Sequence, residues 1–196
     1  MALEKMSHKK LRLDGVRSFS VQFNVTKILD GLYVGGRDSV DDSATLKSLG
    51  ITHVVNCTED KPTTVDGSIH YLHVPIADDP DVAIERHFDA VFGFIQSARE
   101  NGKACLVHCS QGMSRSATFV LGYLVARHNM SVLDALQYTR TLRPVISPNV
   151  GFMQKLLDLE WHTRHRASLD LNKYRKDRFA AIEELVVDAG PSPADG

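Results

Sequence analysis

Cysteine is scarce in this chain, with three residues among 196: Cys57, Cys105 and Cys109. An odd and sparse set does not match the disulfide framework of small secreted domains, so we expect a reducing, intracellular compartment. Apolar runs also stay well short of the roughly 20 residues that a membrane-spanning helix needs. The first five residues do not have the pattern of a signal peptide, and Ala2 stands where N-myristoylation requires glycine. We therefore expect a cytoplasmic location, extending to the nucleus, without a membrane anchor.

An excess of charge of either sign is lacking as well. The chain has 23 basic and 24 acidic residues and a formal net charge of -1. Because no broad basic field is available, nucleic acid is not an expected partner. The nine histidines show neither an HExxH motif nor Cys/His ligand spacing, so we expect neither a metal nor another cofactor.

The length and composition indicate one folded domain. A chain of 196 residues with 43% hydrophobic residues can bury one core rather than two. Residues 1–22 are polar and basic and are expected to form a flexible arm, with the folded domain over 23–163. Residues 164–196 form a C-terminal extension: first basic, then a short amphipathic run over 180–187 that can form a helix, then an end expected to be disordered.

Strand and helix patterns alternate along the expected domain. β-branched and aromatic runs over 26–36, 51–57, 69–76 and 103–107 predict strands, the first of them folded into a pair by an Asp-Gly turn. Spacing and capping patterns predict helices from about 43 to 50, over 85–99, 117–126 and 132–142, and from Pro148 onward. This alternation predicts an α/β fold with a central, mostly parallel twisted sheet flanked by helices.

One loop, between an apolar strand and an apolar helix, combines residues suited to chemistry. Cys109 and Arg115 lie in it with five residues between them. Backbone N–H groups at a helix N-terminus favour an anion, and a guanidinium can pair with two phosphate oxygens. Gly112 permits a backbone angle that other residues resist. A phosphate-like dianion therefore fits this loop, and a cysteine at its base would have a pKa of roughly 3.5–7.5 and act as a nucleophile.

A lone cysteine at a strand end is more often a small buried apolar residue, but packing does not require cysteine, glycine and arginine together in one such loop. His108-Cys109, five residues and then Arg115-Ser116 resemble the signature of cysteine-dependent protein phosphatases. Over about 25–161 the chain is similar to small atypical dual-specificity phosphatases. The resemblance implies a phosphatase fold with a strand, phosphate loop and helix, and hydrolysis of phosphotyrosine, phosphoserine and phosphothreonine through a phosphocysteine. The implied phosphate-binding residues are Ser110, Gln111, Gly112, Met113, Ser114 and Arg115.

The resemblance also implies a proton donor on the loop that follows the strand over 69–76. It favours Asp78, which would be the acid for the first step and the base that activates water in the second. Asp79 and Asp81 are alternatives, and all three carboxylates can instead cap the helix that starts near Ile84, the role we favour for Asp81. Ser116 would donate a hydrogen bond to the sulfur of Cys109, as its counterpart does in the family.

Three further residues have two interpretations each. His108 points away from the loop and is interpreted as a hydrogen-bonded, orienting buried residue rather than a base. Asn149 either supports the loop through its side chain, as in the family, or is an ordinary turn residue. Cys57, at the end of a strand expected beside that of Cys109, is either a resolving thiol, as in some relatives, or a buried sheet residue.

Substrate and partner predictions follow from the same residues. The variable loop positions are uncharged, and no tyrosine-bearing recognition loop is present, which implies a shallow site for phosphoproteins. Lys9-Lys10-Leu11-Arg12-Leu13 resembles peptides that dock on MAP kinases; the alternative is a solvated basic arm. A phosphoprotein-binding module that uses the same loop without turnover is the competing function. A rhodanese or arsenate reductase fits less well, because those chains lack the upstream aspartate loop.

Overall fold

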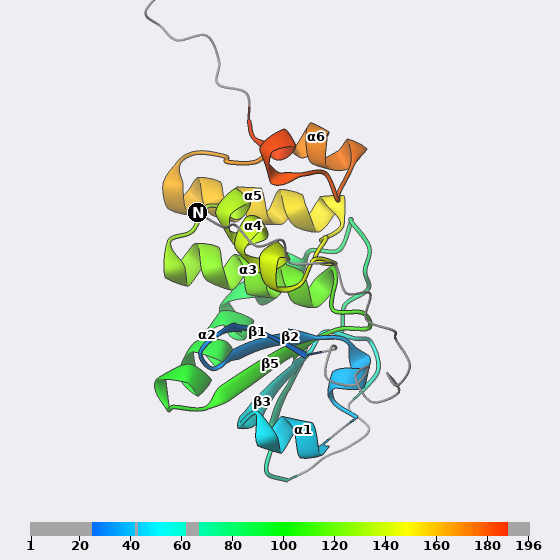
Figure 1. The fold of residues 1–196 in the computed structure, drawn as a ribbon, viewed down its shortest axis with the longest axis vertical. Helices are drawn as coiled ribbons and strands as arrows, with labels where there is room; N and C mark the ends of the chain where they lie inside the picture. Colours follow the sequence, from blue (N-terminus) through cyan, green and yellow to red (C-terminus); the bar gives the residue numbers. More distant parts are fainter. Residues whose placement is uncertain (1–24, 42, 62–66, 188–196) are drawn as a thin grey trace, which may run out of the picture.

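The computed structural model describes residues 25–41, 43–61 and 67–187, in which strands and helices alternate (Figure 1). The predicted basic arm and the predicted disordered end lie outside these residues. No helix among them is long and apolar enough to cross a membrane. In chain order the elements are β1 (Val25–Leu29), β2 (Leu32–Gly35), η2 (Arg37–Ser39), α1 (Ser43–Ser48), β3 (Ile51–Asn56), β4 (His70–His73), η3 (Ile84–His87), α2 (Phe88–Glu100), β5 (Ala104–His108), α3 (Arg115–His128), α4 (Val132–Leu142), α5 (Val150–Arg164), α6 (Leu171–Lys176) and η4 (Ile182–Leu185).

The five strands form one sheet in the order β1-β2-β5-β3-β4. β1 and β2 pair antiparallel across the Asp30-Gly31 turn, where Gly31 has a φ of +75°. The pairs β2 with β5, β5 with β3 and β3 with β4 are parallel. The predicted mostly parallel sheet is confirmed. Because parallel strands end at one edge, the segments after β2, β3, β4 and β5 meet there.

Helices cover the two faces of the sheet unequally (Figure 1). On one face, Leu46 of α1 packs with Val54 and Leu106. On the other face lies the larger core, which includes residues of α2, α3, α4 and α5. The middle of α3 is buried on every side from Ala117 to Val125, as its apolar sequence predicts. This burial fixes the start of α3 against the end of β5.

Three predicted boundaries are wrong by a few residues. β4 covers only His70–His73, where it pairs with β3, rather than 69–76. The helix expected over 85–99 begins as the 3-10 turn η3, and α2 starts at Phe88. Pro148 does not lie in the first turn of α5, because Asn149 is the N-cap and its side chain accepts a hydrogen bond from the Phe152 N–H.

The described part of the C-terminal extension packs on the domain. The amphipathic run expected over 180–187 forms only one 3-10 turn, η4, while α6 arises in the preceding basic stretch. Leu169, Tyr174 and Leu185 are 2%, 0% and 0% exposed and belong to the larger core. Residues 169–185 are therefore part of the folded unit, beside α5 (Figure 1).

Candidate active site

The loop between β5 and α3 forms the cup, residues 109–115, at the carboxyl edge of the sheet. β5 delivers Cys109, and α3 begins at Arg115 with Ser114 as its N-cap. The side chain of Ser114 makes no capping hydrogen bond to the helix. The first N–H groups of α3 are therefore available to an anion, which the helix dipole also favours.

The carbonyl groups of the loop point outward. Arg143 donates from Nε to Gly112 O and from Nη2 to Gln111 O, both at 3.0 Å. The flanking carbonyls are bonded in the same way: Ser110 O accepts from Arg37 N at 3.0 Å, Met113 O from Ser147 N at 2.9 Å and Ser114 O from Thr118 N at 2.8 Å. Because consecutive carbonyls are held outside, the peptide N–H groups face the inside of the cup.

Gly112 allows this curvature for two reasons. Its φ is +69°, a left-handed conformation that residues with a side chain rarely adopt. A Cβ at this position would also lie 2.6 Å from Gly35 O and 2.7 Å from Arg143 Nη2. The predicted need for glycine in the loop is therefore met by both backbone angle and space.

Cys109 lies at the base of the cup and is 2% exposed. Its Sγ accepts hydrogen bonds from Gly112 N and from Ser116 Oγ, each at 3.2 Å. Burial raises the pKa of the Cys109 thiol, but the Ser116 hydroxyl and the backbone N–H groups of Ser116, Gly112 and Gln111 outweigh burial, so the pKa lies below its usual value. These hydrogen bonds favour the thiolate form of the Cys109 sulfur, as expected for this loop.

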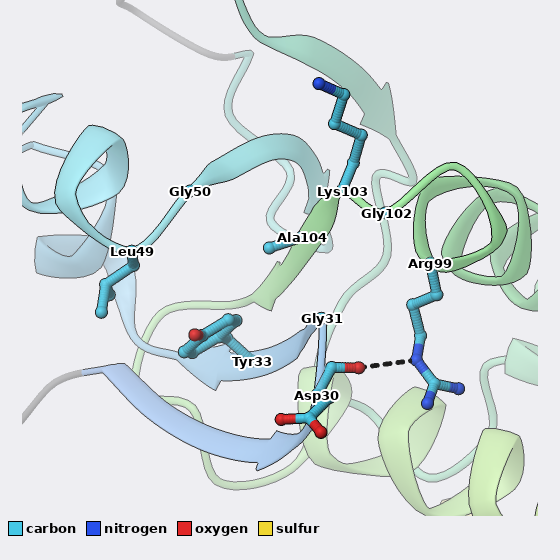
Figure 2. A pocket seen from close by; sticks show the side chains of 9 residues that line it. All are labelled: Asp30, Gly31, Tyr33, Leu49, Gly50, Arg99, Gly102, Lys103 and Ala104. Carbon is cyan, nitrogen blue, oxygen red and sulfur yellow. Dashed lines mark hydrogen bonds between the residues drawn. The ribbon is translucent and has the colours of Figure 1, made fainter.

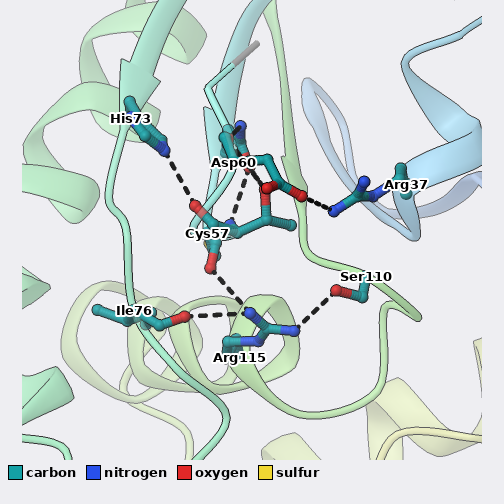
Figure 3. A network of polar contacts seen from close by, with 9 residues as sticks. Arg37, Cys57, Asp60, His73, Ile76, Ser110 and Arg115 are labelled. Atoms are coloured by element: carbon teal, nitrogen blue, oxygen red, sulfur yellow. Dashed lines mark hydrogen bonds and ion pairs between the residues drawn. The ribbon is translucent and has the colours of Figure 1, made fainter. Parts of the chain in front are cut away.

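Arg115 closes the cup from the α3 side (Figure 3). It is 9% exposed, and its Nη1 donates to Ile76 O at 3.0 Å and weakly to Cys57 O at 3.5 Å, while Nη2 donates to Ser110 Oγ at 2.8 Å. Its Nε is buried without a partner among the described residues. A buried, unpaired guanidinium N–H costs free energy unless a ligand accepts from it, so Nε marks a position for a phosphate oxygen.

Asp78 reaches the cup from the loop after β4. Its Oδ1 accepts from Ser114 Oγ at 2.6 Å and from Asn149 Nδ2 at 2.8 Å. Asn149 N also donates to Ser114 Oγ at 3.0 Å, so the three residues form one network. Both hydrogen bonds to the carboxyl end on Oδ1, so Oδ2 is the oxygen able to carry a proton. The Asn149 side chain thus contacts Asp78 and caps α5, whereas the contact with the cup, which was expected of that side chain, is made by its backbone N–H.

The two neighbouring aspartates do not cap the following helix. Asp79 accepts a hydrogen bond from Asp81 N at 2.8 Å, which stabilises the turn that they share. The N-cap of η3 is Ala83, without a side-chain hydrogen bond. The capping role expected of Asp81 is therefore wrong. Asp81 instead donates its backbone N–H to the side chain of Asp79, which forms an Asx turn.

His108 and Cys57 lie side by side beneath the cup. His108 is 3% exposed, and burial lowers its pKa to about 4, while the backbone of Cys109 acts in the opposite direction. Its Nδ1 is buried without a hydrogen-bond partner among the described residues. Cys57 N donates to His108 O at 2.9 Å, and the pKa of the fully buried Cys57 thiol is raised well above its usual value by burial and by the charge of Cys109. Burial therefore keeps Cys57 a neutral thiol beside Cys109.

Further residues that shape the site have no clear sequence signal. Arg143 is 7% exposed and supports the cup from 31 residues away, in a segment predicted only as the end of a helix. Gly151 lets the aspartate loop approach α5, since a Cβ there would lie 1.9 Å from Pro80 O. Arg37 forms an ion pair with Asp60 (Figure 3), and its backbone N–H donates to Ser110 O of the cup.

A separate pocket lies at the opposite end of the sheet, near the start of β5 (Figure 2). Of the two cations that line it, Arg99 already has partners within the protein: Nε donates to Asp30 O at 2.9 Å and Nη1 to Tyr123 OH at 2.7 Å. It contains no cysteine, serine or histidine. The cup is therefore the stronger candidate for the active site.

Comparison with known proteins agrees with this geometry. Residues 32–162 match the family model "Dual specificity phosphatase, catalytic domain". Dual specificity protein phosphatase 15 of Mus musculus is 35% identical over 158 residues, which cover 81% of this chain and 65% of that protein. The crystal structure of DUSP15 has a TM-score of 0.69 at 34% identity, covering 80% of this chain and 97% of that chain. The structure of human tyrosine phosphatase-like serine/threonine/tyrosine-interacting protein has a TM-score of 0.67 at 32% identity. That match covers 71% of this chain and 97% of that chain.

Proposed function

Because this chain belongs to the dual specificity phosphatase family, we propose that it is a protein phosphatase that acts through a phosphocysteine intermediate. The chain covers 65% of the length of the mouse relative, so the activity of the whole protein is part of the proposal. The observation that carries the proposal is the pair of donors on Cys109 Sγ, at 3.2 Å each, beside the unpaired Nε of Arg115.

In the first step, the Cys109 thiolate attacks phosphorus and the bond to the leaving oxygen breaks. Arg115 Nε and the N–H groups of the cup bind the equatorial phosphate oxygens, where charge spreads in the transition state. Asp78, protonated at Oδ2, gives its proton to the leaving oxygen. The hydrogen bonds to Oδ1 from Ser114 and Asn149 orient the acid.

In the second step, water attacks the phosphocysteine and the sulfur–phosphorus bond breaks. Asp78, now a carboxylate, accepts a proton from that water and so returns to its starting state. The Cys109 sulfur leaves as a thiolate, which the Ser116 hydroxyl stabilises at 3.2 Å. The products are inorganic phosphate and the free enzyme, and every proton is accounted for by the carboxyl group and water.

The substrates that we propose are phosphotyrosine, phosphoserine and phosphothreonine in proteins. The uncharged side chains of Gln111 and Met113 favour a phosphoprotein over a highly charged inositide.

A MAP kinase is a proposed partner through Lys9–Leu13, which lies outside the described residues. The cytoplasm and nucleus are the proposed location. Deleting residues 1–22 should weaken kinase binding without changing aryl phosphate hydrolysis; equal binding by both chains would remove this partner.

A phosphoprotein-binding module is the second candidate function. It is favoured by the likeness, at a TM-score of 0.67, to the human tyrosine phosphatase-like serine/threonine/tyrosine-interacting protein. Both functions use the same cup. Catalysis is the better supported of the two, because nucleophile, arginine and acid are present together, and a binder needs neither a thiolate nor a proton donor.

Substitution of the acid tests the proposed chemistry. Asp78→Asn should lower hydrolysis of phenyl phosphate far more than that of difluoromethylumbelliferyl phosphate, whose acidic leaving group needs little protonation. Asp79→Asn is the matched control and should have little effect on either ester. If Asp79→Asn shows the leaving-group effect instead, the acid is wrongly assigned. If the wild-type protein binds phosphopeptides but hydrolyses neither ester, the binding module is the correct function.

A further inference from the structure

The C-terminal segment holds the loop from which α5 begins. Tyr174 of α6 is fully buried, and its Oη donates to Pro148 O at 2.7 Å. Burial raises the pKa of Tyr174 to about 12, so the hydroxyl remains a donor. Arg140 of α4 adds a second connection, since Nε donates to Ile146 O at 3.0 Å and Nη1 to Ala180 O at 3.1 Å. We call residues 168–187 the C-terminal brace. Residues 146–148 are thus fixed against it.

The C-terminal brace is itself firmly attached to the domain. Glu160 of α5 is fully buried, and its Oε2 accepts from Ser168 N and Ser168 Oγ, both at 2.9 Å. Its Oε1 accepts from Val132 N at 3.2 Å, at the start of α4. Within the brace, Asp170 N donates to Leu185 O at 2.8 Å. These bonds and the buried leucines make the brace a fixed support rather than a loose tail.

The supported loop is the one that holds the acid. Pro148 directly precedes Asn149, whose Nδ2 bonds Asp78 Oδ1 at 2.8 Å. Gly151 follows, and the aspartate loop lies so close that a Cβ at this glycine would be 1.9 Å from Pro80 O. The position of the Asp78 carboxyl therefore depends on the backbone at 148–151. That backbone is held by a side chain that lies beyond the family match over 32–162.

We propose that Tyr174 is a positioning residue for Asp78, acting through the Pro148 carbonyl and the Asn149 side chain. The proposal rests on the proposed function, in which Asp78 is the proton donor. Its consequence is that removing the Tyr174 hydroxyl should impair only the step that needs the proton. The thiolate of Cys109 and the phosphate contacts of Arg115 should remain unchanged.

The test compares Tyr174→Phe with Tyr138→Phe. Tyr138 is the matched control, because its hydroxyl also donates to a backbone carbonyl, Ile28 O at 2.6 Å, but at the β1 edge of the sheet. Loss of one neutral hydrogen bond should lower kcat/KM of Tyr174→Phe for phenyl phosphate by roughly three- to tenfold. For difluoromethylumbelliferyl phosphate the loss should stay under about twofold. The pH dependence of Cys109 alkylation should match that of the wild type.

Several outcomes would overturn the proposal while leaving the phosphatase function intact. These are equal losses on the two esters, no loss on either ester, or the same pattern in Tyr138→Phe. A double-mutant cycle measures directly whether Tyr174 and Asp78 act together. If Tyr174 acts through Asp78, Tyr174→Phe should have no further effect on phenyl phosphate in an Asp78→Asn background. An undiminished three- to tenfold loss there would show that Tyr174 acts elsewhere, whereas failure of the wild type to hydrolyse either ester would instead refute the proposed function.

Discussion

Replacing Ser116 by alanine should raise the pKa of the Cys109 thiol. Ser116 is fully buried, and its hydroxyl donates to the Cys109 sulfur at 3.2 Å. Hydrogen bonds to charged groups contribute about 1.5–3 kcal/mol, and one pKa unit corresponds to about 1.4 kcal/mol. Ser116→Ala should therefore raise the thiol pKa by about one to two units. The backbone donors of the cup remain, so part of the depression should persist.

The assay for this pKa is the rate of alkylation of Cys109 by iodoacetate across a pH series. The midpoint for Ser116→Ala should move upward, and the acidic limb of kcat/KM should move with it. Ser114→Ala is the matched control, since that hydroxyl donates to Asp78 at 2.6 Å rather than to the sulfur. An unchanged midpoint in Ser116→Ala, or an equal shift in Ser114→Ala, would refute the assignment of Ser116 as the main side-chain donor.

Other predictions concern the surroundings of the sulfur. Folded His108 stays neutral to a pH of about 4, whereas the unfolded chain binds a proton below about 6.5. Unfolding therefore takes up a proton between these values, and the free energy of unfolding should fall by up to about 3 kcal/mol from pH 7 to 4. His108→Gln should flatten this fall in urea titrations; the same slope would contradict the burial of a neutral ring. Gly112→Ala should lower stability by at least about 1 kcal/mol and weaken orthovanadate binding, and unaltered binding would argue against the tight backbone contact. Peroxide should inactivate the wild type reversibly through a Cys57–Cys109 disulfide, because the two cysteines directly follow Asn56 and His108, which pair in neighbouring strands about 5 Å apart. Cys57→Ser should be inactivated irreversibly while Cys105→Ser recovers with reductant; full recovery of Cys57→Ser would exclude a resolving role.

The fold could be predicted largely from local patterns. The apolar run after Arg115 indicated the buried central helix, and Ser131 with Asp134 indicated the start of α4, where the Ser131 side chain accepts from Asp134 N. Element ends were less accurate, because they depend on partners elsewhere. β4 ends at His73 because its partner β3 ends at Asn56, with which His73 pairs.

The helix α6 escaped prediction because its sequence is dominated by charge. Its one fully buried side chain, Tyr174, gives no amphipathic stripe, and only Asp170 signals a start by capping the first N–H groups. The site divides in the same way. Cys109 and Arg115 lie in one short loop and were recognisable together. Arg143 was not, because its role depends on how a distant loop folds back onto the cup.

The phosphocysteine itself is the most direct object of measurement. The wild-type protein, mixed with phenyl phosphate and quenched rapidly in acid, should carry one phosphate on the peptide that contains Cys109, as read by mass spectrometry. Cys109→Ser should show neither this adduct nor turnover, because a serine at that place has no comparable anion. Turnover without phosphate on Cys109, or retained turnover in Cys109→Ser, would contradict a cysteine-based phosphatase.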